Sequence, residues 1–100
     1  MNSNIAVPKA QLAKLCSRYH IRRLALFGSV LRNDFTAISD VDVLVDFAPG
    51  ARVGLIALAG LEMELSHLLG RRTDVHTTKG LNPLFRDEVA AQAEVLYEQA

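Results

Sequence analysis

Apolar residues recur with the period of an amphipathic helix in two parts of the chain. The first helical face lies near the N-terminus, after Pro8, and consists of Leu12, Leu15, Cys16 and Tyr19. The second stretch predicts a long helix from about Val53 to Leu69, and Gly70 is well placed to end it as a C′ cap. Asn82 and Pro83 suit an N-cap and a first helical position, so we expect a further helix to start there.

Shorter runs of apolar residues between these helices predict strands. The expected strands are Leu24–Phe27, Asp40–Phe47 and Arg72–Thr78. We expect one or two helical turns over 30–33 and a loop over 36–39. Residues 94–98 fit either a last strand or an extension of the preceding helix, and periodicity does not decide between the two. This order predicts an α/β or α+β layered domain spanning residues 1–100, with a small sheet covered by helices on one face.

Length, charge and cysteine content exclude several classes of protein. The 100 residues allow one small core. Eleven Lys and Arg residues balance eleven Asp and Glu residues, which argues against a protein that mainly grips nucleic-acid backbone. No apolar run reaches the ~18 residues of a membrane span, and 1–8 has no signal-peptide core. Cys16 is the single cysteine, which excludes an internal disulfide framework and a cysteine-cage metal site. We expect a cytoplasmic protein without direct nucleic-acid or membrane contact.

The aspartates at the start of the second expected strand are the first candidates for chemistry. Asp40 and Asp42 stand two apart, so their carboxylates project to the same face of the strand. Two such charges a few Å apart repel by roughly 4 kcal/mol at an effective dielectric of about 20. A bound divalent cation turns this repulsion into ligation, and hard oxygen donors suit Mg²⁺. Asp74 lies in the third expected strand, where a neighbouring position would bring a third carboxylate close.

A short segment before these aspartates has the features of a phosphate-binding turn. Gly28 lets backbone approach a ligand, and Ser29 adds a hydroxyl to the amides at a helix start. Arg32 follows three residues later as a cation on the same side, although an ion pair with Asp34 is an equal alternative. A phosphate cradle beside clustered carboxylates indicates phosphoryl or nucleotidyl transfer.

Taken together, Gly28-Ser29, Arg32 and the segment Ser39–Val45 resemble the signature of the minimal nucleotidyltransferase domain. This domain is a branch of the DNA polymerase β-like nucleotidyltransferase superfamily, and the resemblance covers nearly the whole chain. It implies a mixed β-sheet, Mg²⁺ and a nucleoside triphosphate, usually ATP. Leu31 and Asn33 depart from the family pattern, which has small residues at both positions.

The resemblance also implies a role for individual residues. Asp40 and Asp42 would ligate the metal, and Asp74 would join them while polarising the acceptor hydroxyl. Gly28 and Ser29 would hold the triphosphate, and the remaining candidates for nucleotide contact are Arg32 and Ser39.

Each candidate also has a plainer interpretation. Ser39 suits a loop cap, and Asp74 suits a surface ion pair with Arg71 or Arg72. His76 shares the strand face of Asp74 and is a weaker site candidate.

The resemblance implies a protein partner as well. Many members are antitoxins paired with a HEPN-domain ribonuclease toxin, and some transfer AMP to the toxin. Since 100 residues leave no room for an acceptor-binding domain, we expect a partner to present the acceptor. Two alternatives remain: a non-catalytic antitoxin acting by contact, and a nucleotidyltransferase subunit acting on a small molecule. Self-association stays open.

Overall fold

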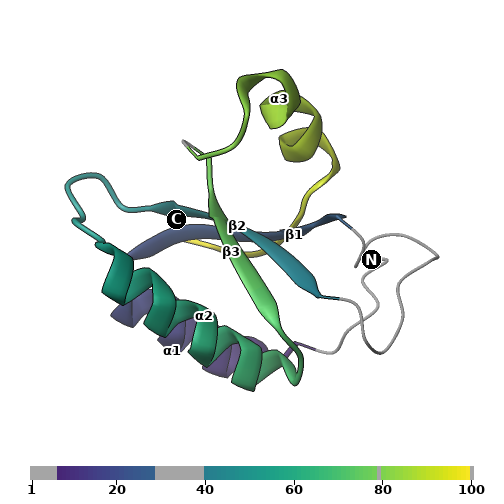
Figure 1. Ribbon diagram of the computed structural model, residues 1–100. Helices are drawn as coiled ribbons and strands as arrows, with labels where there is room; N and C mark the ends of the chain where they lie inside the picture. The colour runs from purple at the N-terminus through teal and green to yellow at the C-terminus, as the bar shows by residue number, and fades with distance from the viewer. Residues whose placement is uncertain (1–6, 29–39, 79, 100) are drawn as a thin grey trace.

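The computed structural model describes residues 7–28, 40–78 and 80–99 of the chain (Figure 1). Helices and strands alternate along these residues in the order that the hydrophobic pattern predicts. The elements are α1 (Lys9–Arg18), β1 (Ile21–Phe27), β2 (Val41–Phe47), α2 (Leu55–Leu69), β3 (Thr73–Thr77), α3 (Pro83–Gln92) and β4 (Glu94–Glu98).

The four strands form one mixed sheet in the order β3-β2-β1-β4. β1 pairs antiparallel with β2 and with β4, whereas β2 and β3 pair in parallel. A parallel pair needs a long crossover connection, which α2 supplies between β2 and β3. The predicted fold class, a small mixed sheet with helices, is confirmed.

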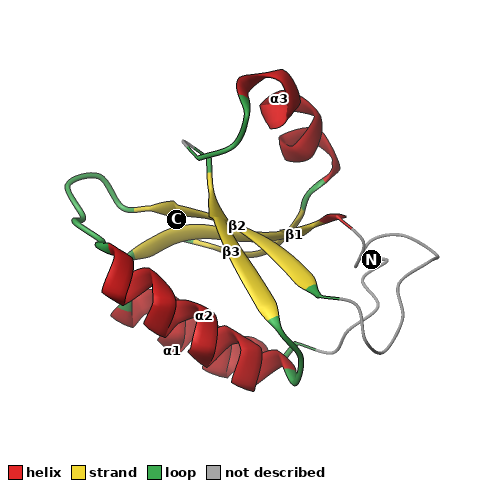
Figure 2. Cartoon of the chain, in the orientation of Figure 1, coloured by secondary structure: helices red, strands yellow, loops and turns green. Residues whose placement is uncertain are grey.

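The helices lie on both sides of this sheet, not on one face as the sequence led us to expect. α1 and α2 run side by side along one face, and α3 lies on the opposite side (Figures 1 and 2). The reason is topological. β3 and β4 occupy opposite edges, so the connection between them, which contains α3, must cross the sheet. The first face is already covered by α1 and α2, which leaves the second face for α3.

The core lies between the sheet and the α1–α2 layer, and strand alternation sorts apolar from acidic residues. Val41, Val43 and Val45 point into this core and are fully or almost fully buried. Asp42 and Asp46, at the intervening positions, are only half-buried and face the other side. Buried residues of the helices complete the core: Leu12, Leu15, Cys16, Leu61, Leu65 and Leu69.

Most predicted element ends fall within three residues of the observed ones. The Asn82 side chain accepts a hydrogen bond from the amide of Leu84 at 2.9 Å, which confirms the predicted N-cap of α3. Residues 94–98 form a strand, which decides the alternative that periodicity left open. The turns expected over 30–33 and the loop over 36–39 lie outside the described residues. In the described parts of the chain, no helix combines the length and hydrophobicity needed to cross a membrane.

Candidate active site

Two carboxylates meet on the face of the sheet that points away from α1 and α2. Asp42 of β2 and Asp74 of β3 are direct partners in the parallel register. Phe27 of β1 is the partner of Asp42 on its other side, so these residues form one row across three strands. The prediction that neighbouring strands bring Asp74 close to Asp42 is therefore confirmed as geometry. The catalytic roles of both residues stay a prediction.

Gly28 lies directly against the carboxylate of Asp42. Its φ angle is +79°, in the left-handed region that favours glycine. A Cβ atom built on this residue would lie only 2.7 Å from Oδ2 of Asp42. Glycine is therefore required here for two reasons, the backbone conformation and the space that the carboxylate occupies. From the sequence, only phosphate binding explained this glycine.

His76 makes a direct contact with Asp42 that the sequence did not predict. Its Nε2 atom lies 3.2 Å from Oδ1 of Asp42, within hydrogen-bond distance. The imidazole ring also packs edge-to-face against Phe27, with centroids 5.2 Å apart and planes at 70°. The available signal was the i, i+2 spacing from Asp74, which places His76 on the same face. Asp42, Asp74, His76 and Gly28 thus lie together in this part of the sheet.

The side chain of Arg72 lies between the carboxylates of Asp40 and Asp74. Nε of Arg72 is 4.0 Å from Oδ2 of Asp40 and 3.8 Å from Oδ1 of Asp74. The predicted surface ion pair of Asp74 with an arginine therefore exists. The Arg72 side chain is 76% exposed, so water screens both ion pairs and the guanidinium can turn away into solvent.

This arrangement bears on whether the residues can hold a metal ion. Among the described residues, no three His, Cys, Asp or Glu side chains converge as ligands of one ion. Asp40 and Asp74 nevertheless both approach the guanidinium of Arg72, which holds a positive charge between them. The donors are carboxylate oxygens, the ligands that Mg²⁺ prefers. The donor chemistry of Asp40 and Asp74 therefore fits a hard divalent cation in the position that Arg72 occupies, and Asp42, the register partner of Asp74, offers a further carboxylate.

The third strand is fixed by α2 along its outer edge. Oγ of Ser66 accepts a hydrogen bond from the amide of Thr73 at 2.9 Å, and Oε2 of Glu62 accepts one from the amide of Val75 at 2.8 Å. Thr73 and Val75, which donate these hydrogen bonds, are the residues directly before and after Asp74 in the sequence. Side chains of α2 thus satisfy backbone donors that an edge strand leaves unpaired.

The three remaining candidate residues cannot be placed. Ser29, Arg32 and Ser39 lie outside the described residues, so their predicted nucleotide contacts stay predictions.

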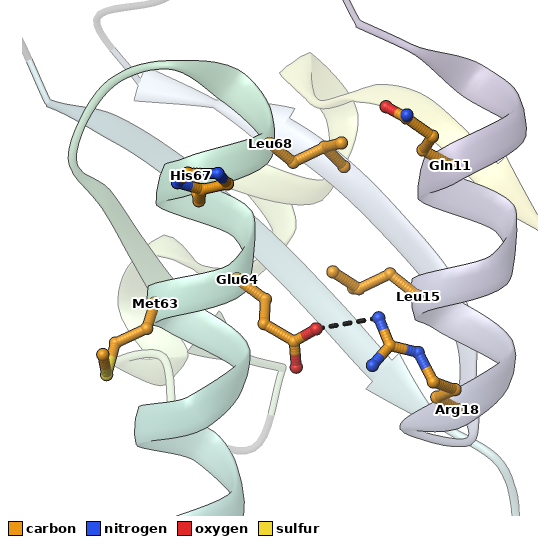
Figure 3. Close-up of a pocket in the computed structure, with 7 residues that line it drawn as sticks. All are labelled: Gln11, Leu15, Arg18, Met63, Glu64, His67 and Leu68. Atoms are coloured by element: carbon orange, nitrogen blue, oxygen red, sulfur yellow. Dashed lines mark hydrogen bonds and ion pairs between the residues drawn. The ribbon is translucent and has the colours of Figure 1, made fainter.

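Two of the grooves that the described residues form run along α2, and one of these two is lined by a candidate site residue. A groove of about 690 Å³ lies between α1 and α2, with an ion pair at 2.8 Å between Arg18 and Glu64 beside Leu15 (Figure 3). None of the described candidates lines it. A second groove, of about 860 Å³, follows α2 and the start of β3 and is lined by Arg72 and Asp74.

Hydrogen bonding at the α1–α2 groove changes the acidity of two side chains. The hydroxyl of Tyr19 donates to Glu64, and this bond, together with Arg18, holds the pKa of the Glu64 carboxyl below its ordinary value. The same bond raises the pKa of Tyr19. These interactions join the two helices and lie away from the carboxylates of the sheet.

Comparison with known proteins assigns the chain to a family. The profile of the nucleotidyltransferase domain matches residues 9–96. MJ0435 of Methanocaldococcus jannaschii, provisionally named a protein adenylyltransferase, is 33% identical over 90% of this chain and 95% of its own length. A solved structure provisionally described as a minimal nucleotidyltransferase is 36% identical, with a TM-score of 0.70 over 85% of each chain.

A further solved structure resembles the chain in fold alone. It is a chain in the complex of a tri-AMPylated HEPN toxin of Shewanella oneidensis with its MNT antitoxin. The match covers 91% of this chain and 70% of that one, with 22% identity and a TM-score of 0.64. With the profile match and the two closer relatives, the predicted membership is confirmed: the chain belongs to the nucleotidyltransferase domain family and is a minimal nucleotidyltransferase.

Proposed function

We propose that this protein transfers AMP from ATP to a hydroxyl of a partner protein in a Mg²⁺-dependent reaction. The partner we propose is a HEPN-type toxin, for which the protein would serve as antitoxin in the cytoplasm. One observation carries the enzymatic part: Asp42 and Asp74 are register partners on adjacent parallel strands of a family whose members transfer nucleotides. Nothing in the packing of the core requires carboxylates at these positions, because both face away from it.

We assign different roles to the carboxylates of Asp40, Asp42 and Asp74 because they differ in position. We assign metal ligation to Asp40 and Asp42, with Asp74 completing the set from the neighbouring strand. Mg²⁺ bound there would neutralise triphosphate charge and favour attack by the acceptor oxygen. Gly28 leaves room for the Asp42 carboxylate, and the exposed side chain of Arg72 would be able to turn into solvent if a cation were held there.

Asp74 faces the side from which an acceptor can approach. It lines the groove along α2 and β3, which the other two aspartates do not line. We therefore assign Asp74 the task of accepting the proton from the attacking hydroxyl, whose oxygen bonds to the α-phosphorus of ATP as pyrophosphate leaves. General-base catalysis of this kind typically contributes 10²–10⁴-fold, and the ideal base lies within hydrogen-bond reach of that proton.

The partner assignment rests on the relatives. MJ0435 is provisionally named for transfer of AMP to protein, and a structure of similar fold belongs to the complex with an AMPylated HEPN toxin. In this proposal the partner brings its own hydroxyl to the groove beside Asp74.

Transfer is tested with the protein, its co-purified partner and ATP labelled in the α-phosphate. We expect label on the partner in the presence of Mg²⁺ and none with EDTA. Asp42→Ala should abolish both ATP binding and transfer, whereas Asp74→Ala should bind ATP normally and lose transfer by about 10²–10⁴-fold. Asp87→Ala, which removes an exposed carboxylate on α3, is the matched control and should transfer normally. Normal transfer by the Asp74→Ala variant would remove Asp74 from the reaction.

A second function, neutralisation of the partner by contact alone, is favoured by one specific observation. Arg72 already lies between two of the three carboxylates and offsets their charge without any metal. A contact antitoxin needs no transfer, so its Asp42→Asn variant should still suppress toxicity in cells. An adenylyltransferase antitoxin should fail in the same assay.

A further inference from the structure

We infer that His76 is a positioning residue that fixes the orientation of the Asp42 carboxylate for cation binding. This inference rests on the proposed function, since it concerns the same site. It goes beyond that function because it assigns a role to a side chain outside the three aspartates.

The two oxygens of the Asp42 carboxylate have different neighbours, one on β3 and one directly after β1. Oδ1 lies 3.2 Å from Nε2 of His76 on β3, and Oδ2 lies toward Gly28 at the end of β1. A carboxylate attached through a single rotatable Cβ–Cγ bond otherwise has a broad range of orientations. The contact with His76 on one side and the close approach of Gly28 on the other restrict this rotation.

The imidazole that holds Asp42 is itself held in place. Its ring packs edge-to-face on Phe27, and its backbone lies in register with Leu44, whose side chain is 8% exposed. The amide of Val75, the residue before His76, is bonded to Glu62 of α2. Because ring packing and an anchored strand fix the imidazole, its contact can restrict the orientation of the Asp42 carboxylate.

A purely stabilising role does not account for this contact. The side chains of His76 and Asp42 are 39% and 29% exposed, so water screens their interaction and little stability comes from it. An apolar side chain would pack against Phe27 equally well. The property that imidazole adds is a directed hydrogen bond to a carboxylate oxygen. Hydrogen-bond partners of metal-ligating groups typically set metal affinity by 10–100-fold.

The test is Mn²⁺ binding, measured by calorimetry and by electron paramagnetic resonance on the full chain. His76→Leu keeps the bulk of the side chain and removes the donor, while His76→Gln keeps an N–H donor at a similar reach. We expect His76→Leu to weaken Mn²⁺ binding by about 10–100-fold, and His76→Gln to restore it to within about threefold of wild type. His67→Leu changes an exposed histidine on α2 and should bind Mn²⁺ normally.

Two further readouts separate positioning from other roles. The melting temperature of the metal-free protein should be nearly the same for wild type, His76→Leu and His76→Gln, because the role is not structural. The electron spin echo of bound Mn²⁺ should lack the modulation of a directly coordinated nitrogen. In an Asp42→Asn background the His76→Leu change should have no additional effect on Mn²⁺ binding, since its action passes through Asp42.

Each alternative result overturns the inference in a recognisable way. Normal Mn²⁺ binding by His76→Leu removes His76 from the site and leaves the proposed function intact. A coordinated-nitrogen signal in the wild type makes His76 a ligand, not a positioning residue. Failure of the wild-type protein to bind Mn²⁺, alone or with a non-hydrolysable ATP analogue, overturns the metal-dependent function and this inference together.

Discussion

Gly28 and Asp42 are packed so closely that a single methyl group at position 28 would lie 2.7 Å from the carboxylate. The Gly28→Ala variant should therefore displace Asp42 and weaken Mn²⁺ binding, in addition to straining a backbone with φ of +79°. Gly50→Ala is the matched control, because Gly50 has φ of +83° with no atom within 4 Å of the added Cβ. Both variants should lose roughly 1 kcal/mol or more of stability, measured by chemical denaturation. Only Gly28→Ala should lose metal affinity, and equal losses in both would contradict the steric explanation.

The outer edge of β3 is expected to depend on two side chains of α2. Removing them in Ser66→Ala and Glu62→Ala leaves the amides of Thr73 and Val75 without these partners. We expect each change to cost about 1–3 kcal/mol in urea denaturation, and the double variant to self-associate through the exposed edge in light scattering. Met63→Ala truncates an exposed side chain of the same helix and should do neither. A fully stable, monomeric double variant would show that the strand does not need these bonds.

The bond between Tyr19 and Glu64 predicts a dependence of stability on acid pH. Because folding lowers the pKa of Glu64, its stabilisation is complete above the ordinary value of 4.5 and is lost as the pH falls through the lowered pKa. The melting temperature of the wild type should therefore fall more steeply below pH 4.5 than that of Glu64→Gln. Glu88→Gln, at an exposed position of α3, should follow the wild-type curve. Parallel curves for wild type and Glu64→Gln would show that the bond contributes nothing in solution.

The core cysteine should be chemically inert in the folded protein. Burial raises the pKa of the Cys16 thiol from its ordinary value of 9.0 to about 12. At pH 8 a thiol reagent should react with Cys16 only after denaturation, which an absorbance assay measures directly.

The same shift has a consequence at alkaline pH. Because folding raises the pKa of the Cys16 thiol, the contribution of this thiol to the free energy of unfolding is fully present below pH 9.0. It declines as the pH rises toward about 12. The slope is roughly 1.4 kcal/mol per pH unit in the wild type. The Cys16→Ala variant should lack this dependence of stability on alkaline pH. In the reactivity assay, reaction of the native thiol at pH 8 would contradict its burial.

The strand face on which Asp42 and Asp74 lie was predictable from strand periodicity, whereas their pairing in register depends on which strands are neighbours. Alternation puts each aspartate on the face of its strand opposite the core. For Asp42, the burial of the next residue, Val43, shows which face points into the core. The contact of His76 with Asp42 was not predictable in the same way. His76 is in register with Leu44, so it reaches Asp42 diagonally, and such a contact depends on side-chain orientation.

The position of α3 shows a different limit of sequence reasoning. Asn82 and Pro83 predict the N-terminus of α3 from local sequence, and the helix begins where these residues predict. The side of the sheet on which it lies depends on which strands occupy the two edges. That information is distributed over β1, β3 and β4, and no local pattern contains it.

The anchoring of β3 to α2 has a consequence for how this protein tolerates change. Asp74 stands between two residues whose amides are held by Ser66 and Glu62, so its position is set by a helix that gives no carboxylate to the site. Asp42 lies on an interior strand whose valines fill the core, and its carboxylate contacts β3 through His76. A substitution in α2 can therefore change two properties of the protein, the free energy of unfolding and the distance between Asp42 and Asp74. A screen that measures the melting temperature alone reports only the first of these.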